Sequence, residues 1–522
     1  MKREPMKRLT LTWLAALTLL LGASSCKKES ADTHEHNGED IAIDTTAYAS
    51  FFKKYPDFKE YEGDIKELYR KHNHYIWHEK KGLIEVAEVL YNRVNQLDDE
   101  GLPSKIPYRA KINELFENGG RGERPDMESE LLISSMYFFY TKKVFEGMDT
   151  SKSRQTGWFL PREKVDYVAY LDTLMQDPKA IKGEQELFSQ YFNLKKALQK
   201  YRGIQKKGGW PKIDLPERTK SLKEGDNNAA VGQLKKRLAA EGYYSGAIDT
   251  NFDSGLTNAL KAYEEKHFRE YKGPVTADMI KELNIPVEQR IKTITVNMER
   301  CRWVPADIDH KDEYIAVNIP SYRLRYIKDG KLALISNVVV GKELNKTVVF
   351  SGQMSYLVFA PYWNIPPSIL EKEIKPGIEK NPNYLEEHNM EWDGDRVRQK
   401  PGGQNSLGLV KFMFPNSNNI YLHDTPAKSL FNKDERAFSH GCVRVERARD
   451  LAIALTKKEK NWTPEQVDEA MHGEKETTFA LKKKIPVYII YFTAFADEKG
   501  NAAFFDDVYN RDDRLAHLLY RD

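Results

Sequence analysis

The chain has 522 residues, of which 40% are hydrophobic and 11% aromatic, so it has enough apolar material for several folded cores and is not wholly disordered. This length predicts about two to four domains. The 81 Lys and Arg residues nearly balance the 78 Asp and Glu residues, and no long basic run is present, so nothing in the composition indicates nucleic acid as a partner.

Residues 1–26 differ in composition from the rest of the chain and predict an export signal. A basic start is followed by an apolar stretch over residues 9–22, which is too short to span a bilayer comfortably. The run Leu-Gly-Ala-Ser-Ser-Cys that ends at Cys26 resembles a bacterial lipobox, in which the cysteine is lipidated. A short signal anchor is the alternative. We expect a lipoprotein signal peptide, with Cys26 as the first residue of the mature protein.

Residues 27–46 are polar and acidic, and we expect a flexible tether between the membrane and the folded body. His34 and His36 lie in this segment. Two histidines without further ligands are more typical of a solvated tail than of a metal site, so no metal is predicted.

Residues 47–210 are predicted to form a helical scaffold domain. Residues spaced as on one helical face are Leu83, Val86, Leu90 and Val94. An aromatic-rich run covers residues 131–145, and a Gly-rich break covers 119–125. No compact catalytic constellation is present, so a structural role is expected.

A compact module is predicted over residues 219–285, after a turn-rich boundary. Its three short helices carry apolar faces made by Val231, Leu234 and Leu238, by Leu256, Leu260 and Tyr263, and by Met279, Ile280 and Leu283. This layout, with Leu-Lys-Glu-Gly-Asp at 222–226, resembles the peptidoglycan-binding domain 1 family. A three-helix spacer that binds nothing is the alternative.

Residues 291–510 are predicted to form a mainly-β domain. Apolar alternation over 315–319 and 324–326, and the Asp329-Gly330 turn before 332–340, indicate hairpins. Further strands are expected at 348–350, 356–359, 410–414, 420–423, 487–495 and 502–505, and a helix at about 445–455. The fold class is therefore multidomain α+β.

A polar, Pro-rich insertion at about 363–404 interrupts the β pattern. A long stretch without regular structure in a compact domain is usually a functional lid or a small subdomain. A disordered surface insertion is the alternative.

The candidate chemistry lies around His423 and Cys442. Cys442 is in a Gly-containing turn before the expected helix, whose N-terminal amides would favour a thiolate. His423 ends a predicted strand and is the candidate base, which takes the thiol proton and returns a proton to a leaving amine. Strand alternation turns the Asp424 side chain away, so its backbone carbonyl is the better candidate to hold the imidazole.

Neighbouring residues add to this candidate site. His440 and Arg444 add donors or positive charge near the sulfur, and Gly441 lets backbone amides point at a developing oxyanion. Tyr421 shares a strand face with His423. A lone cysteine or histidine is usually a packing residue, so only the combination is specific.

The pattern of His423, fifteen residues, Ser-His-Gly-Cys, an apolar residue and Arg444 resembles the catalytic signature of the L,D-transpeptidase (YkuD) family. The resemblance implies that Cys442 is the nucleophile and His423 the general acid/base. The residues that it implies as shaping the site and its oxyanion hole are Ser439, His440, Gly441 and Arg444. Many members of the family carry Asn at the position of Arg444.

The domain order is similar to that of the large periplasmic subgroup of this family, and the run Asn297 to Pro305 also fits that subgroup. Within this run, Cys301 is interpreted as a packing thiol. Trp363 and Asn364 begin the insertion as the subgroup's substrate-capping segment does. With Tyr421, they are therefore candidate substrate-binding residues.

The resemblance implies an enzyme that links the third-position diamino acids of two peptidoglycan stem peptides through a Cys442 thioester, without any cofactor. The same site would serve an L,D-carboxypeptidase or endopeptidase, or protein attachment to the wall. A non-catalytic peptidoglycan-binding lipoprotein is the alternative from another class, and the intact His423 and Cys442 argue against it. We expect the protein in the periplasm of a Gram-negative bacterium, with the membrane as a partner through its lipid anchor.

Overall fold

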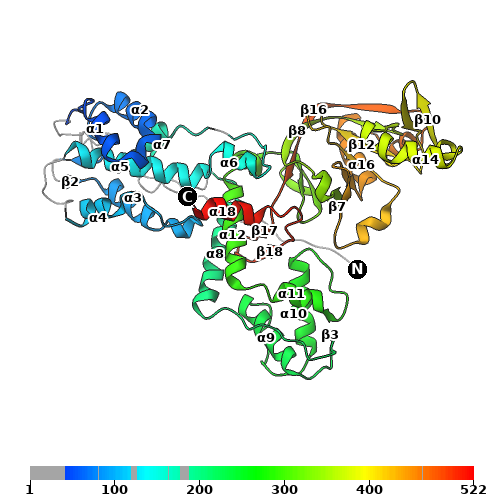
Figure 1. Cartoon of the computed structure of the whole chain (residues 1–522), viewed down its shortest axis with the longest axis horizontal. Helices are drawn as coiled ribbons and strands as arrows, with labels where there is room; N and C mark the ends of the chain where they lie inside the picture. The colour runs from blue at the N-terminus through cyan, green and yellow to red at the C-terminus, as the bar shows by residue number, and fades with distance from the viewer. Residues whose placement is uncertain are drawn as a thin grey trace, which may run out of the picture. The chain divides into compact units, whose positions relative to one another are not determined.

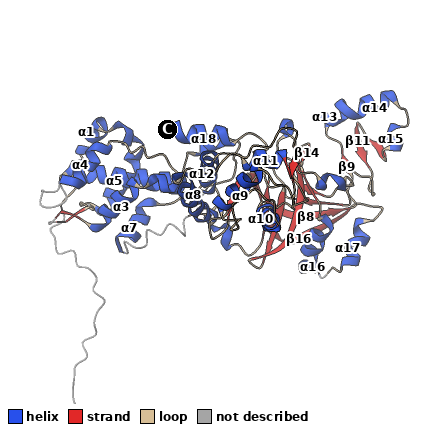
Figure 2. Ribbon diagram, turned by 90° about the horizontal axis from the view of Figure 1, so that it is seen from below, coloured by secondary structure: helices blue, strands red, loops and turns tan. Residues whose placement is uncertain are grey.

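The computed structural model describes residues 41–79, 82–118, 126–162, 164–176, 187–460 and 462–521. The predicted signal peptide with Cys26, most of the tether with its two histidines, and the break at 119–125 lie outside these ranges. Within the described ranges, no helix combines the length and apolar character needed to cross a bilayer. Helices form the first part of the chain and strands dominate the later part (Figures 1 and 2), so the multidomain α+β prediction is confirmed.

The helical region is built around α5 (Met127–Thr141). Asp126 caps this helix by accepting a hydrogen bond from the backbone N–H of Ser129 at 3.0 Å. Every residue from Ser129 to Thr141 is buried, as expected for a central helix. The other helices of this region are α1 (Ala47–Lys54), α2 (Glu62–His72), α3 (Glu85–Asn95), α4 (Arg109–Asn118), α6 (Thr150–Gln155) and α7 (Tyr167–Gln176). A short hairpin of β1 (His78–Glu79) and β2 (Gly82–Leu83) lies between α2 and α3.

Two long helices connect this region to the rest of the chain. α8 (Gln190–Lys206) packs against α12 (Val287–Cys301), and the C-terminal helix α18 (Asp512–Arg521) also contacts α12 (Figure 1). Cys301, at the end of α12, is fully buried and forms no disulfide, which confirms its interpretation as a packing thiol.

The module between them contains the three predicted helices, α9 (Ala229–Glu241), α10 (Ser254–Lys266) and α11 (Ala277–Leu283). Side chains that accept a hydrogen bond from the first turn of each helix are Asn228, Asp253 and Thr276. The three predicted apolar faces meet in a separate core. A small ladder that the sequence did not predict, β3 (Ser221–Leu222) with β4 (Val275–Thr276), joins its two ends.

The β region forms a nine-stranded sheet in the order β14-β7-β15-β13-β12-β8-β16-β5-β6. Because β6 also pairs with β7, the sheet closes on itself as a barrel. Its strands are β5 (Tyr314–Asn318), β6 (Arg323–Lys328), β7 (Lys331–Gly341), β8 (Phe350–Phe359), β12 (Val410–Met413), β13 (Leu422–His423), β14 (Ala437–Ser439), β15 (Val443–Val445) and β16 (Thr477–Ile490). α16 (Ala448–Lys460) contacts β12 and β16, and α17 (Pro464–Met471) packs on α16.

Several expected strand boundaries were wrong. The strands expected at 348–350 and 356–359 are one strand, β8, because the polar residues between them stay in the backbone ladder with β16. β16 begins at Thr477 rather than at 487 and ends at Ile490. The rest of that expected strand is β17 (Ala494–Ala496), which forms a separate hairpin with β18 (Ala502–Phe504).

The insertion is a small folded subdomain, one of the two forms expected from the sequence, and not a disordered surface insertion. It contains β9 (Trp363–Asn364), α13 (Pro367–Ile369), a π-helical turn (Leu370–Ile374), α14 (Lys375–Lys380), α15 (Tyr384–Glu387), β10 (Met390–Asp393) and β11 (Arg396–Gln399). Its strands pair in the order β10-β11-β9. Its core residues are Ile365, Ile369, Leu370, Ile374, Met390 and Val397, a cluster separate from that of the barrel. The apolar residues of the insertion are too widely spaced in the sequence to predict its helices and strands. They nevertheless form a core when those helices and strands pack on each other.

Candidate active site

Two parallel strands bring the candidate catalytic residues onto one face. β13 and β15 pair with Leu422 opposite Val443 and His423 opposite Arg444. Leu422 and Val443 are fully buried in the barrel core. Because strand side chains alternate, His423 and Arg444 lie on the other face, and Cys442 just before β15 continues it.

The turn that carries Cys442 is held by Ser439. The Ser439 hydroxyl donates to the Cys442 carbonyl at 2.6 Å and accepts from the Gly441 N–H at 3.1 Å. Gly441 has φ +117°, a conformation that L side chains rarely adopt, so glycine is required here by backbone geometry. Ser439 is almost fully buried, so it shapes the turn from inside.

The expectation that Cys442 caps a helix was wrong. Residues 443–445 form β15, and α16 begins only at Ala448, so helix N-terminal amides do not surround the sulfur. Burial raises the pKa of the Cys442 thiol, while hydrogen bonds from Tyr421 and the charge of Arg444 oppose that rise. The thiol is therefore protonated at rest and lies 3.7 Å from the Asn419 carbonyl, to which it donates.

His423 ends β13 as predicted and is almost fully buried. Its Nδ1 lies 2.5 Å from the Asp424 carbonyl, which can only accept, so Nδ1 carries the proton and Nε2 is the free base. Burial lowers the pKa of His423 to about 4, helped by the charge of Arg444, while backbone contacts with Asp424 and Leu407 act in the opposite direction. The resting pair is thus a neutral thiol and a neutral imidazole.

The Asp424 carboxylate points away from the imidazole, as predicted. It accepts from the Leu409 N–H at 3.0 Å and pairs with Lys428 at 2.6 Å. Gly408 leaves room for it, since a Cβ there would meet the Asp424 side chain at 2.4 Å. The carboxylate therefore fixes the loop beside β13, and the backbone carbonyl of the same residue fixes the imidazole.

The two charged neighbours of Cys442 have different surroundings. Arg444 is half-buried beside the thiol, and its Nε has no partner among the described residues. Cys442 acts to raise the pKa of Arg444, although burial, the larger effect, lowers it. His440 instead points to the insertion, where its Nε2 lies 3.4 Å from a carboxylate oxygen of Glu373. The charge near the sulfur is thus that of Arg444.

The three candidate substrate-binding residues belong to two different parts of the domain. Tyr421 lies on the shared face, with its ring centroid 5.7 Å from that of His423. Burial, and to a smaller extent interaction with Cys442, raises the pKa of Tyr421. Trp363 and Asn364 form β9 in the insertion sheet, opposite Gln399 and Arg398. Trp363 packs on the insertion core.

Sequence reasoning missed Asn419 and Glu373. Asn419 has φ +52° at the end of an Asn-rich turn, and asparagine tolerates this conformation better than most residues. The Asn-rich sequence could have predicted this turn, but it could not have predicted the contact of the Asn419 carbonyl with the Cys442 thiol. Glu373 gave no signal, because only the fold of the insertion brings it to His440.

A cleft of about 680 Å³ lies elsewhere, between the helical region and α18. Residues from both sides of it include Lys142, Glu146 and Leu519, and none of the candidate catalytic residues lines it. Among the described residues, no group of three or more His, Cys, Asp or Glu side chains is placed to hold a metal ion.

Three family models match the chain. Residues 312–473 match "L,D-transpeptidase catalytic domain", residues 63–198 match "Scaffold domain", and residues 227–283 match "Putative peptidoglycan binding domain". The candidate residues around His423 and Cys442 fall within the first of these matches.

A curated relative in Haemophilus influenzae, named "Putative L,D-transpeptidase", is 36% identical over 243 residues, which cover 42% of this chain and 48% of the relative. The chain thus spans about half the length of that relative. Among solved structures, an L,D-transpeptidase from Xylanimonas cellulosilytica aligns at 13% identity over 53% of this chain and 100% of that one, with a TM-score of 0.18. An L,D-transpeptidase from Mycobacterium smegmatis aligns at 11% sequence identity over 34% of this chain and 58% of that one, with a TM-score of 0.21.

Proposed function

We propose that the protein is a peptidoglycan L,D-transpeptidase that joins third-position diamino acids of two stem peptides, because residues 312–473 match the L,D-transpeptidase (YkuD) catalytic domain family. The observation that carries this proposal is the shared face of β13 and β15, where a buried neutral imidazole ends β13 and a thiol lies just before β15. A neutral pair of this kind suits stepwise acyl transfer.

In the first step, Nε2 of His423 takes the proton of the Cys442 thiol, and the sulfur attacks the carbonyl carbon of the third residue of a donor tetrapeptide. A C–S bond forms and the carbonyl oxygen becomes an oxyanion. When this intermediate collapses, the C–N bond to the terminal D-Ala breaks, and His423 gives its proton to the leaving amine. A thioester on Cys442 remains.

In the second step, the side-chain amine of an acceptor stem attacks the thioester. Its proton passes to His423 and the new C–N bond forms. The C–S bond of the thioester then breaks, and His423 returns the proton to the sulfur, which restores the Cys442 thiol. The half-buried Arg444 guanidinium offsets negative charge on the sulfur in both steps. Water competes with the amine, and the insertion that contacts His440 through Glu373 shields the thioester from it.

The rest of the chain fits an enzyme of the cell envelope. The match at residues 227–283 supports contact of this module with peptidoglycan, near the substrate. Lipidation at Cys26 would keep the enzyme at a membrane of a Gram-negative bacterium, facing the periplasm.

The test is intact-mass analysis of the chain without residues 1–26 after exposure to a carbapenem, whose strained β-lactam carbonyl acylates nucleophiles. We expect one adduct on the parent and none on Cys442→Ala. Cys301→Ala is the matched control, because it removes the buried thiol of α12 and should keep the adduct. Purified tetrapeptide stems then identify the product. A folded parent that forms no adduct would overturn the proposal.

A further inference from the structure

A buried hydroxyl outside the signature motif also holds the turn of Cys442. The Thr347 hydroxyl donates to the Gly441 carbonyl at 2.8 Å and accepts from the Gly341 N–H at 2.9 Å. Thr347 is fully buried, so water does not compete for either bond. The loop after β7 is therefore fastened to the peptide bond that precedes the cysteine.

A second hydroxyl fastens the same loop to the C-terminal segment. Tyr509 OH donates to the Gly341 carbonyl at 2.7 Å and accepts from the Thr347 N–H at 3.1 Å. Tyr509 is also buried. It lies beyond residue 473, where the match to the catalytic domain family ends.

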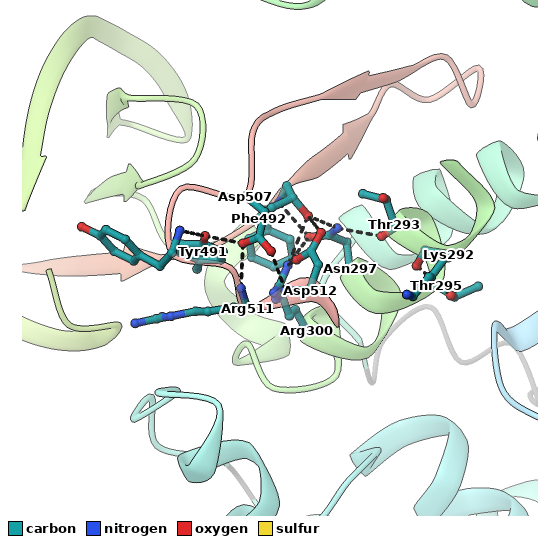
Figure 3. Close-up of polar contacts among 12 residues, drawn as sticks. Lys292, Thr293, Thr295, Asn297, Arg300, Tyr491, Phe492, Asp507, Arg511 and Asp512 are labelled. Atoms are coloured by element: carbon teal, nitrogen blue, oxygen red, sulfur yellow. Dashed lines mark hydrogen bonds and ion pairs between the residues drawn. The ribbon is translucent and has the colours of Figure 1, made fainter. Parts of the chain in front are cut away.

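The backbone of Tyr509 is itself fixed by a partly buried polar network (Figure 3). Its N–H donates to Tyr491 OH at 2.8 Å, and Tyr491 OH donates to Asp507 Oδ1 at 2.5 Å. Asp507 also accepts from the backbone N–H groups of Arg511 and Asp512, at 2.9 and 2.7 Å. The segment that carries Tyr509 is thus held at both ends.

The network continues into α12. Arg300 pairs with the Asp512 carboxylate at 2.7 Å, and Thr493 donates to the same carboxylate at 2.7 Å. Asn297 then donates to Thr493 Oγ1 at 2.7 Å. A continuous set of hydrogen bonds therefore connects α12 and the start of α18 with the carbonyl of Gly441.

The Gly441 carbonyl and the Cys442 N–H belong to one planar peptide unit, so fixing the carbonyl also fixes the direction of the N–H. The hydrogen bonds of the turn use the Gly441 N–H, the Gly441 carbonyl and the Cys442 carbonyl. None of them uses the Cys442 N–H. In acyl transfer by a nucleophilic residue, the amide of that residue is well placed to bind the oxyanion.

We propose that Thr347 and Tyr509 are positioning residues, which orient the Cys442 N–H toward the oxyanion and so make the C-terminal segment part of the active site. This inference rests on the proposed acyl transfer at Cys442. Neither residue touches the substrate, and each acts through the peptide unit before the nucleophile. The geometry distinguishes this role from packing alone, because the hydroxyl and not the bulk of each side chain is required.

The test uses full-length protein in detergent with Thr347→Val, which keeps shape and loses the hydroxyl, and Thr347→Ser, which keeps the hydroxyl. Tyr509→Phe removes the second hydroxyl. Tyr326→Phe is the matched control, since Tyr326 is a fully buried tyrosine of the same barrel whose hydroxyl donates to Glu313 at 2.5 Å, on a strand that carries none of the candidate catalytic residues. For each variant, the rates of carbapenem acylation and of iodoacetamide alkylation are measured.

Thr347→Val and Tyr509→Phe should slow acylation by about 10- to 100-fold, the range expected when an oxyanion donor is misplaced. Alkylation passes through no oxyanion, so its rate should change by less than about twofold, and Thr347→Ser should restore most of the acylation rate. Equal loss of both rates would indicate a general packing defect and overturn the inference. Unchanged acylation in Thr347→Val, with a parent that acylates, would overturn it while leaving the proposed function intact.

A second measurement does not depend on catalysis. Hydrogen–deuterium exchange of residues 437–445 should accelerate in Thr347→Val and Tyr509→Phe and stay as in the parent in Thr347→Ser and Tyr326→Phe. If exchange in this segment is unchanged by loss of either hydroxyl, the positioning role is wrong, whatever the activity of the parent.

Discussion

His423 and Cys442 are held in their uncharged forms by burial rather than as an ion pair. A buried imidazole loses the hydration that stabilises its cation, and the nearby guanidinium of Arg444 disfavours that cation further. The same burial disfavours the thiolate. In the proposed acyl transfer, proton transfer from sulfur to Nε2 is therefore part of the reaction, and the proposed base stays unprotonated over a wider pH range than an exposed histidine would.

This state predicts the pH dependence of acylation. Because the pKa of His423 is lowered to about 4, the rate of carbapenem acylation should stay nearly constant from pH 7.5 down to about pH 5 and fall only as the imidazole becomes protonated near pH 4. Rates across buffers from pH 4 to 8, at constant ionic strength, check this. A decline centred near pH 6.5 would show that the imidazole titrates as an exposed group, contrary to the burial described.

The insertion contacts the turn of Cys442 through Glu373 and His440. Its sheet and helices share a core of their own, and it joins the barrel through β9 and β11, where Asn364 lies opposite Arg398. Because those two residues face each other in an antiparallel pair, a two-residue Asn-Gly turn can replace residues 365–397 without moving the ends.

We expect this deletion variant to fold and to be acylated, because the barrel core does not include residues of the insertion core. With the shield removed, water should reach the thioester, so the ratio of hydrolysed to cross-linked product should rise several-fold. Chromatography of products from purified stem peptides measures this ratio. An unchanged ratio would mean that the insertion does not exclude water.

A single substitution tests whether the contact between Glu373 and His440 contributes to the exclusion of water. Glu373→Gln removes the charge that faces His440, and Glu371→Gln is the matched control on the same π-helical turn, where Glu371 pairs with Lys375. Both pairs are about half exposed, so neither change should alter the free energy of unfolding by more than about 1 kcal/mol. Only Glu373→Gln should raise the hydrolysed fraction.

At the scale of the whole molecule, the module of α9, α10 and α11 is attached to the long helices by buried polar groups. Glu241 accepts from Tyr201 and pairs with Arg237, whose guanidinium lies 3.7 Å from the centre of the Trp210 ring. His267 at the end of α10 is buried beside the Phe504 ring of the β17–β18 hairpin, 6.4 Å between centroids. Such buried groups make this attachment sensitive to protonation.

Acid should therefore weaken the folded state well above the pH at which carboxylates titrate. Burial lowers the pKa of His267 to about 4, so between pH 6.5 and 4 the unfolded chain binds the proton more tightly and stability falls as pH falls. At pH 4.5 this histidine alone accounts for a loss of about 2 to 3 kcal/mol. Urea unfolding at pH 7 and pH 4.5 measures the loss, and His267→Phe should reduce it by that amount. An equal loss in parent and variant would contradict this origin.

The sequence by itself indicated the candidate site residues and much of the local structure. The His423 and Ser439–Cys442 segments are short and contiguous, so their residue types and spacing were readable without a fold. Helical and strand periodicity likewise predicted the three apolar faces of α9 to α11 and the hairpin of β6 and β7, because side chains three, four or two positions apart share a face for local geometric reasons.

Only the tertiary structure decided the rest. Whether Cys442 precedes a helix or a strand depended on the pairing of β15 with β7 and β13, and the uncharged state of His423 depended on its burial. The contacts of Thr347 with Gly441 and Tyr509, and of Glu373 with His440, join segments far apart in sequence. Burial and long-range hydrogen bonds are set by which distant segments meet, and no local pattern of residues encodes that meeting.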